Sequence, residues 1–294
     1  MYTLDLRFLD TEATIAAFLV PTGEGPVLIE TGPHSTLPHL ETAVQNLGFS
    51  LQDIRHVLIT HIHLDHAGAS WALAQQGATI YLHPAGVRHL AAPERLWQSA
   101  SQIYGDKMEY LWGQMQPTPL EQLRPMEHGE QLSIGGQTFT AWHTPGHAVH
   151  HLAWQWQLEL FCGDVAGVRI GSGPVVPPCP PPDIDVEAWQ ASIQLIRDLK
   201  PAALHLTHFG KVEKTDIPFH LNELSRRLNE YAAWMQPHFE AGHSSQEITP
   251  AFMAFAQADL QNHGVDAAGL DQYEKANPAW MSVAGLLRYW KKKQ

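Results

Sequence analysis

The stretch Thr60-His61-Ile62-His63-Leu64-Asp65-His66 places three histidines and one aspartate within six consecutive residues, directly after an apolar run at 57–59. In an extended segment residues two apart share a face, so His61 and His63 can point together at one metal ion. A turn at Leu64 would send Asp65 and His66 toward a neighbouring position. This stretch therefore predicts that one short segment supplies ligands to two ions.

Three further candidate ligands lie just beyond apolar segments with the character of strands. His147 follows the segment 138–142, Asp164 follows 158–162, and His208 follows 203–206. The ends of strands are where an α/β sheet gathers its functional groups. Two ions with four or slightly more ligands each need about seven protein groups plus water. The sequence offers seven: His61, His63, Asp65, His66, His147, Asp164 and His208.

Short apolar segments that alternate with helical periodicity predict an α/β fold. The N-terminus alternates apolar and polar residues like a first strand. Helical spacing is present at 37–47, at 68–76 and at 186–199, where Pro201 ends the last helix. We therefore expect an α/β sandwich in which helices cover the faces of sheets. The predicted strands are 17–20, 26–29, 56–60, 78–82, 138–142, 152–156, 158–162 and 203–206.

The character of the sequence changes after Gly210, and from about Pro218 to the end the spacing of apolar residues is helical. This spacing predicts a C-terminal helical appendage. We place a catalytic domain at 1–212 and a helical domain at 213–294. The aromatic residues of this appendage are expected to form its core: Trp234, Trp280, Tyr289 and Trp290. The proline-rich loop 174–182 fits a plain connector and a wall of the site equally well.

Composition restricts the class of substrate and the cellular compartment. The formal net charge is −12, which disfavours nucleic acid because phosphate backbones are bound chiefly by Lys and Arg. No apolar run approaches the roughly 18 residues of a membrane span, and the N-terminus does not have the pattern of a signal peptide. The two cysteines, Cys162 and Cys179, are expected to be reduced. These features together favour a cytoplasmic protein with a small-molecule substrate; whether it forms a homodimer stays open.

Four motifs together resemble the metal-binding motifs of the metallo-β-lactamase-fold superfamily. They are T-H-I-H-L-D-H at 60–66, T-P-G-H at 144–147, C-G-D at 162–164 and T-H-F-G at 207–210. The resemblance covers about the first 210 residues and implies an αββα sandwich with the metals at one edge. It implies that His61, His63 and His147 bind one ion, that Asp65, His66 and His208 bind the other, and that Asp164 bridges the two.

One position departs from the pattern of many relatives. Where they have Asp-Thr-Gly after an early strand, this chain has Glu30-Thr31-Gly32. We expect Glu30 to orient a ligand histidine from outside the ligand set. His150 and His151 follow His147 closely enough to line the site, although a structural role is also open. Arg169 and His151 are weaker candidates for contact with the substrate.

The resemblance implies hydrolysis by a metal-bridging hydroxide, in which Asp65 orients the water or transfers its proton. Length and helical appendage make the chain most similar to the glyoxalase II-like branch, so a small thioester, ester or lactone is the expected substrate. Two divalent ions are expected, with zinc favoured over iron or manganese. A mononuclear iron persulfide dioxygenase is the alternative enzyme, and a non-catalytic metal-binding module is the alternative outside enzymes.

Overall fold

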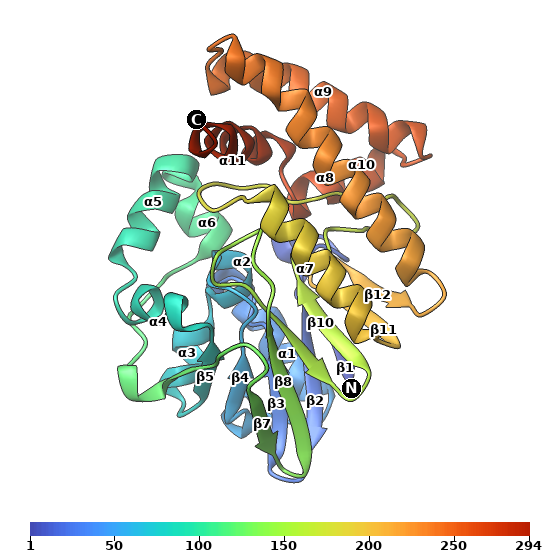
Figure 1. Ribbon diagram of the computed structural model, residues 1–294. Helices are drawn as coiled ribbons and strands as arrows, with labels where there is room; N and C mark the ends of the chain where they lie inside the picture. Colours follow the sequence, from blue (N-terminus) through green and yellow to red (C-terminus); the bar gives the residue numbers. More distant parts are fainter.

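The computed structural model describes residues 1–294 and has two six-stranded sheets that face each other (Figure 1). The first sheet has the order β1-β2-β3-β4-β5-β6. Its strands are β1 (Tyr2–Asp5), β2 (Ala16–Thr22), β3 (Gly25–Ile29), β4 (His56–Leu58), β5 (Thr79–Leu82) and β6 (Leu123–Pro125). The second has the order β12-β11-β10-β9-β8-β7. Its strands are β7 (Gln131–Ile134), β8 (Gln137–His143), β9 (Leu152–Trp156), β10 (Glu159–Gly163), β11 (Ala203–Leu206) and β12 (Gly210–Glu213).

Apolar side chains from both sheets form the core between them. Phe18 and Leu58 come from the first sheet, and Phe139, Trp154 and Phe161 come from the second. Because the Trp154 indole also donates a hydrogen bond to the Ile59 carbonyl at 3.0 Å, its one polar atom is satisfied inside this core. The contact ties the second sheet to the segment that leads into the histidine-rich stretch.

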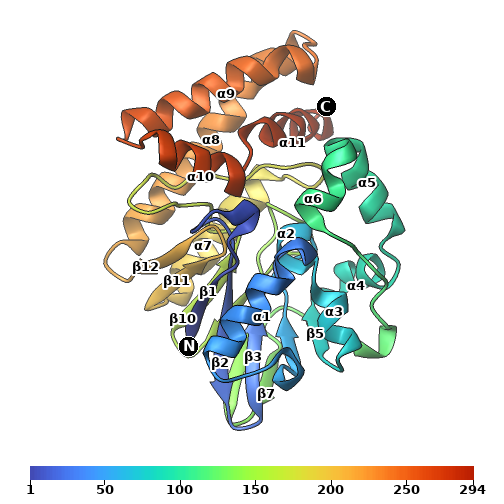
Figure 2. The same cartoon turned by 180° about the vertical axis from the view of Figure 1, so that it is seen from behind.

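Helices cover the outer faces of both sheets, so the architecture is an αββα sandwich with added C-terminal helices (Figures 1 and 2). The side of the first sheet has α1 (Leu37–Asn46), α2 (Leu64–Ala67), α3 (Ser70–Gln75), α4 (Pro84–Ala91), α5 (Glu94–Tyr104) and α6 (Met108–Trp112). The side of the second sheet has α7 (Val186–Leu199), α8 (Ile217–Glu240), α9 (Ser245–Asn262), α10 (Ala267–Ala276) and α11 (Ala279–Lys292). The predicted fold class is confirmed.

The predicted strands and helices are all present, with ends that shift by a few residues. The sequence pattern did not predict three short strands, β6, β7 and β12, or the helices α2, α5 and α6. The strand β7 does alternate, since Leu132 and Ile134 are less exposed than Gln131 and Ser133, but four residues give a weak signal. The two cysteines are unpaired and buried. None of the helices is long and apolar enough to cross a membrane.

The C-terminal helices share one hydrophobic core with the second sheet. Leu160 and Leu204 of the sheet pack in the same cluster as Trp189 of α7, Leu224 of α8 and Leu286 of α11. The apolar face of α8 therefore packs on the side of the second sheet, and α9 and α11 pack against α8. The predicted domain boundary between residues 212 and 213 thus divides residues whose side chains form one continuous hydrophobic core.

His220 joins α8 to the loop after β10. Its ring is 1% exposed, and its Nε2 donates a hydrogen bond to the Ala166 carbonyl at 2.8 Å. Burial lowers the pKa of His220 to about 4. The unfolded chain therefore binds a proton that the folded chain excludes between about pH 6.5 and pH 4, and the folded state loses stability as the pH falls through this window.

We predict that the variant His220→Gln loses less stability on acidification than the natural chain, because glutamine can still donate to Ala166 but does not titrate. The free energy of unfolding at pH 7 minus that at pH 4 should be smaller in the variant by up to about 3 kcal/mol. Urea denaturation at the two pH values measures it. Equal differences for the two proteins would contradict the proposed role of His220.

Candidate metal centre

The seven predicted ligands come together at one edge of the sandwich, where strands of both sheets end. Strands β3, β4 and β5 run parallel in one sheet, as do β10 and β11 in the other, so their carboxyl ends meet there. His61 and His63 follow β4, and Asp65 and His66 lie on α2. The others follow second-sheet strands: His147 after β8, Asp164 after β10 and His208 after β11.

Three imidazole nitrogens form the first group. His61 Nε2 lies 2.9 Å from His63 Nδ1 and 3.2 Å from His147 Nε2. His63 Nδ1 and His147 Nε2 are 3.0 Å apart. Burial lowers the pKa of His61 well below its ordinary value and lowers the pKa of His147 to about 4. Neutral imidazoles present lone pairs, so the three nitrogens suit one shared cation.

The second group contains one carboxylate and two histidines. Asp65 Oδ2 lies 3.6 Å from His66 Nε2 and 3.4 Å from His208 Nε2. Burial opposes the charged imidazole, but Asp164, Asp65 and Glu30 raise the pKa of His66 well above its ordinary value. The negative charge of these carboxylates thus favours a cation at this position.

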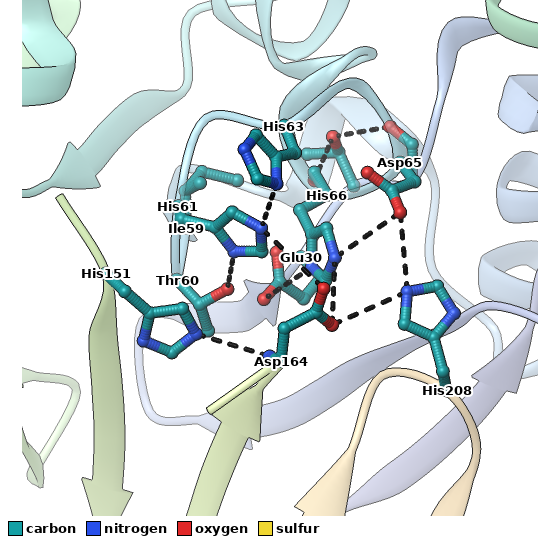
Figure 3. Close-up of polar contacts among 12 residues, drawn as sticks. Glu30, Ile59, Thr60, His61, His63, Asp65, His66, His151, Asp164 and His208 are labelled. Atoms are coloured by element: carbon teal, nitrogen blue, oxygen red, sulfur yellow. Dashed lines mark hydrogen bonds and ion pairs between the residues drawn. The ribbon is translucent and has the colours of Figure 1, made fainter. Parts of the chain in front are cut away.

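Asp164 lies between the two groups (Figure 3). Its Oδ1 is 3.3 Å from His66 Nε2 and 3.5 Å from His208 Nε2, whereas its Oδ2 is 3.3 Å from His147 Nε2. Each carboxylate oxygen therefore faces a different group of histidines. The arrangement is the one expected of a carboxylate that bridges two cations.

Backbone carbonyls fix the orientation of two of these histidines. His147 donates from Nδ1 to the Pro178 carbonyl at 2.9 Å, and His208 donates from Nδ1 to the Thr14 carbonyl at 2.8 Å. Because the proton is on Nδ1, the Nε2 lone pair of each ring points into the cluster. The sequence did not reveal either partner, since Thr14 is separated from His208 by 194 residues.

Helix α11 holds the proline-rich loop 174–182 in place. The amide of Cys179 donates to Ser282 Oγ at 3.3 Å. A Cβ at Gly285 would lie 2.0 Å from the Cys179 carbonyl oxygen, so only glycine allows this approach. The carbonyl that orients His147 belongs to the preceding residue, Pro178. The C-terminal helix thus supports the site through this loop.

Several buried polar atoms of the cluster have no hydrogen-bond partner. They are both nitrogens of His66, both carboxylate oxygens of Glu30 and Oδ1 of Asp164. Buried polar atoms without partners are rare and costly in folded proteins, and an ion is one way to satisfy them. The groups His61, His63, His147 and Asp65, His66, His208 each have ligand atoms within 4.8 Å of one another. The residues present therefore fit divalent metal ions.

Glu30 is fully buried behind His66, with Oε1 at 3.4 Å from His66 Nδ1 (Figure 3). Its φ of 66° lies in the left-handed region that non-glycine residues rarely adopt. The next residue, Thr31, donates from both its amide and its hydroxyl to the His66 carbonyl, at 2.8 and 2.9 Å. The Glu30-Thr31 segment thus contacts both the ring and the backbone of His66.

We predict that Glu30→Gln weakens zinc affinity by about tenfold to a hundredfold, because the neutral amide removes the charge beside the His66 ring while it keeps the side-chain shape. Competition with a chelator of known affinity measures the change. Glu24→Gln, at an exposed glutamate of the β2–β3 hairpin, is the control and should bind zinc like the natural chain. Unchanged affinity in Glu30→Gln would show that Glu30 does not orient His66.

The weaker candidates for substrate contact lie elsewhere. The Arg169 guanidinium donates from Nε to the Gly173 carbonyl of its own loop at 3.3 Å. His151 is fully buried; its Nδ1 donates to Thr144 Oγ1 at 2.8 Å and its Nε2 accepts from the Asp164 amide at 3.2 Å. Neither side chain lines the cavity beside the cluster. His151 supports the backbone of Asp164, and His150 is buried, with its Nδ1 unpaired.

An αββα sandwich with histidine and aspartate clusters at one edge defines a class of metal-binding proteins, and sequence comparison identifies it. The profile of the metallo-beta-lactamase superfamily matches residues 11–208. This chain belongs to that superfamily, whose members are mostly metal-dependent hydrolases.

Individual relatives agree with this assignment. The chain is 28% identical over 216 residues to the metallo-beta-lactamase fold-containing protein ST1585 of Sulfurisphaera tokodaii, covering 71% of this chain and 78% of that one. It is 25% identical over 215 residues to an atrochrysone carboxyl ACP thioesterase of Aspergillus fumigatus, covering 71% and 41%. The structure of a metallo-beta-lactamase family protein from Thermus thermophilus shares the fold over 99% of this chain and 93% of that one, with a TM-score of 0.62 and 21% identity.

Proposed function

We propose that this chain is a hydrolase that uses two divalent metal ions, zinc in the first place, to cleave a small thioester, ester or lactone. The observation that carries the proposal is the position of Asp164, whose two oxygens face two different histidine groups 3.3 to 3.5 Å away. Two such ions, when bound, make a water more acidic and polarise the carbonyl of a substrate.

Some residues of the site would bind the metal ions, and Asp65 would also orient the water. His61, His63 and His147 would hold one ion, and Asp65, His66 and His208 the other, with Asp164 shared. The Asp65 side chain is 23% exposed and lines the cavity beside the cluster, whereas that of Asp164 is 5% exposed. Burial opposes ionisation, but His66 and His208 lower the pKa of Asp65 to about 2. Asp65 is thus a carboxylate at neutral pH that can orient a water by accepting its proton in a hydrogen bond.

The substrate part of the proposal is supported by the relative that is named a thioesterase. The most specific part of the proposal is that the chain belongs to the glyoxalase II-like branch. This part rests on the C-terminal helices and the complete ligand set. The cations on the cavity wall are Lys107 and Lys275. Lys275 is already bonded to Asp271 at 2.7 Å and to Thr11 at 2.8 Å, so the proposal does not extend to glutathione in particular.

A substrate panel with measured metal content tests the proposal. The chain, reconstituted separately with zinc, manganese or iron, is assayed on an ester, a thioester, a lactone and a phosphodiester. We expect two ions per chain and hydrolysis of the thioester, ester or lactone, lost with a chelator and restored by metal. A metal-loaded chain that is inert on the whole panel would refute hydrolysis. One iron per chain with oxygen consumption on a persulfide would favour the dioxygenase instead.

A further inference from the structure

A cavity of about 340 Å³ lies beside the cluster, and His63, Asp65 and Asp164 are part of its wall. Most of the remaining wall is apolar and comes from segments far apart in the sequence. Helices α5 and α6 contribute Tyr104, Leu111 and Trp112, and α11 contributes Trp280 and Met281. In both overall views α11 lies beside α5 and α6 (Figures 1 and 2). The predicted role of Trp280 in the core of the appendage is therefore incomplete, because its side chain also faces this cavity.

Aromatic contacts hold this wall in place. The Tyr104 ring packs edge-on against Trp112 at 5.1 Å and against Trp280 at 6.0 Å between centroids. Its hydroxyl donates to Met281 Sδ at 2.9 Å, which joins α5 to α11. Tyr104, Leu111, Trp280 and Met281 are only partly buried. Apolar area is thus left facing the cavity, and a ligand that covers it gains free energy.

The charges on the wall do not suit an anionic group inside the cavity. Lys275 is paired with Asp271 and Thr11, and Lys107 is exposed to solvent. Glu274 also lines the cavity, and desolvation by the surrounding residues raises the pKa of its carboxyl group. Asp65 and Asp164 add negative charge near the metal cluster. No unpaired buried cation is available to a carboxylate or phosphate there, whereas an uncharged apolar group meets side chains of its own kind.

We infer that this cavity binds the acyl part of the substrate, and that the preferred acyl group is uncharged, apolar and medium in length. The volume of about 340 Å³ lies at the lower end of the range for small-molecule sites, which suits a group of medium length. The inference rests on the proposed hydrolase. In that reaction the bond from the acyl carbon to sulfur or oxygen breaks, water supplies a hydroxyl to the acyl carbon, and its proton leaves with the thiol or alcohol.

Straight-chain acyl thioesters of N-acetylcysteamine, from two to sixteen carbons, test the inference on the zinc-loaded chain. We expect kcat/KM to rise by up to roughly fourfold per added methylene, the factor for full burial, and to level off at a medium length within the series. Leu111→Trp should move the limit to shorter chains and Leu111→Ala to longer ones. Leu120→Trp, at a residue 66% exposed and away from the wall, is the matched control and should keep the natural profile.

A merely structural role of Leu111 would lower kcat/KM for every chain length by one factor, and that result would overturn the inference. So would a preference for acetyl or for acyl groups that end in a carboxylate. Circular dichroism checks that the variants fold. If Leu111→Trp does not fold, the shift of the chain-length limit in Leu111→Ala tests the inference instead.

Calorimetric titration with octanamide and with acetamide supplies a readout that does not depend on turnover. We expect octanamide to bind more tightly than acetamide, and Leu111→Trp to weaken octanamide. Octanamide binding without hydrolysis of any thioester, ester or lactone would refute the proposed function and support the cavity assignment. Hydrolysis that is equal for all chain lengths, with no octanamide binding, would support the proposed function and refute the cavity assignment.

Discussion

Replacing Asp164 with alanine is expected to lower kcat/KM by about a thousandfold and to reduce the metal content from two ions to one or none. Asp164 is the side chain that contacts both groups, with His147 on one side and His66 and His208 on the other. Its loss removes a ligand from each proposed ion. Mass-spectrometric metal analysis and kinetics on the same sample measure both effects.

Two further variants separate the causes. Asp164→Asn keeps the shape of the side chain but removes its charge, so it should also lose metal if charge is what binds the second ion. Asp198→Ala, at an exposed aspartate of α7, should bind two ions and turn over like the natural chain. An Asp164→Ala variant that keeps both ions and full activity would contradict the bridging role.

Replacing Arg227 with alanine is expected to lower the free energy of unfolding by about 3–5 kcal/mol. The Arg227 side chain is 2% exposed and connects α8 to α9. It donates to Glu223 at 2.6 Å and to Asp259 at 2.9 Å. Without the guanidinium, Asp259 loses its counter-charge in a partly buried position, and Glu223 keeps only its contact with the more exposed Arg226. A cavity also replaces the side chain.

The neighbouring Arg226 provides a matched control. It also pairs with Glu223, at 2.8 Å, but its side chain is 42% exposed. Exposed ion pairs contribute little, so Arg226→Ala should cost less than about 1 kcal/mol. Urea denaturation of both variants measures the difference. If the two substitutions cost the same, burial of Arg227 does not determine the strength of the contact between α8 and α9.

The ligand cluster could be predicted because each ligand follows an apolar strand. The segment 56–59 and the alternation around His61 and His63 indicate a strand end with two rings on one face. The parallel strands of an α/β sheet then bring His147, Asp164 and His208 to the same edge. Local patterns of this kind do not depend on how distant parts of the chain pack.

The surroundings of the cluster could not be predicted, because they depend on backbone atoms and on contacts between distant segments. The carbonyls of Thr14 and Pro178 orient two histidines, but any residue type carries a carbonyl. The spacing of Leu96, Ala100 and Tyr104 is helical and could have indicated α5. It could not have indicated that α5 faces Trp280 and Met281 of α11.

The C-terminal helices illustrate the same limit. Their periodicity identifies the apolar face of α8, on which Leu221, Leu224 and Leu228 lie. Periodicity does not reveal which surface that face covers, and an independent helical core was the simplest expectation. The structure instead places these leucines in one cluster with Leu160 and Leu204 of the second sheet.

The zinc stoichiometry of the chain at saturation tests the central claim most directly. The metal-free chain is incubated with excess zinc, desalted, and analysed for zinc and protein in parallel with Asp164→Ala. We predict two zinc ions per natural chain and one or none in the variant. A natural chain that retains one ion or none, or an Asp164→Ala variant that retains two, would contradict it.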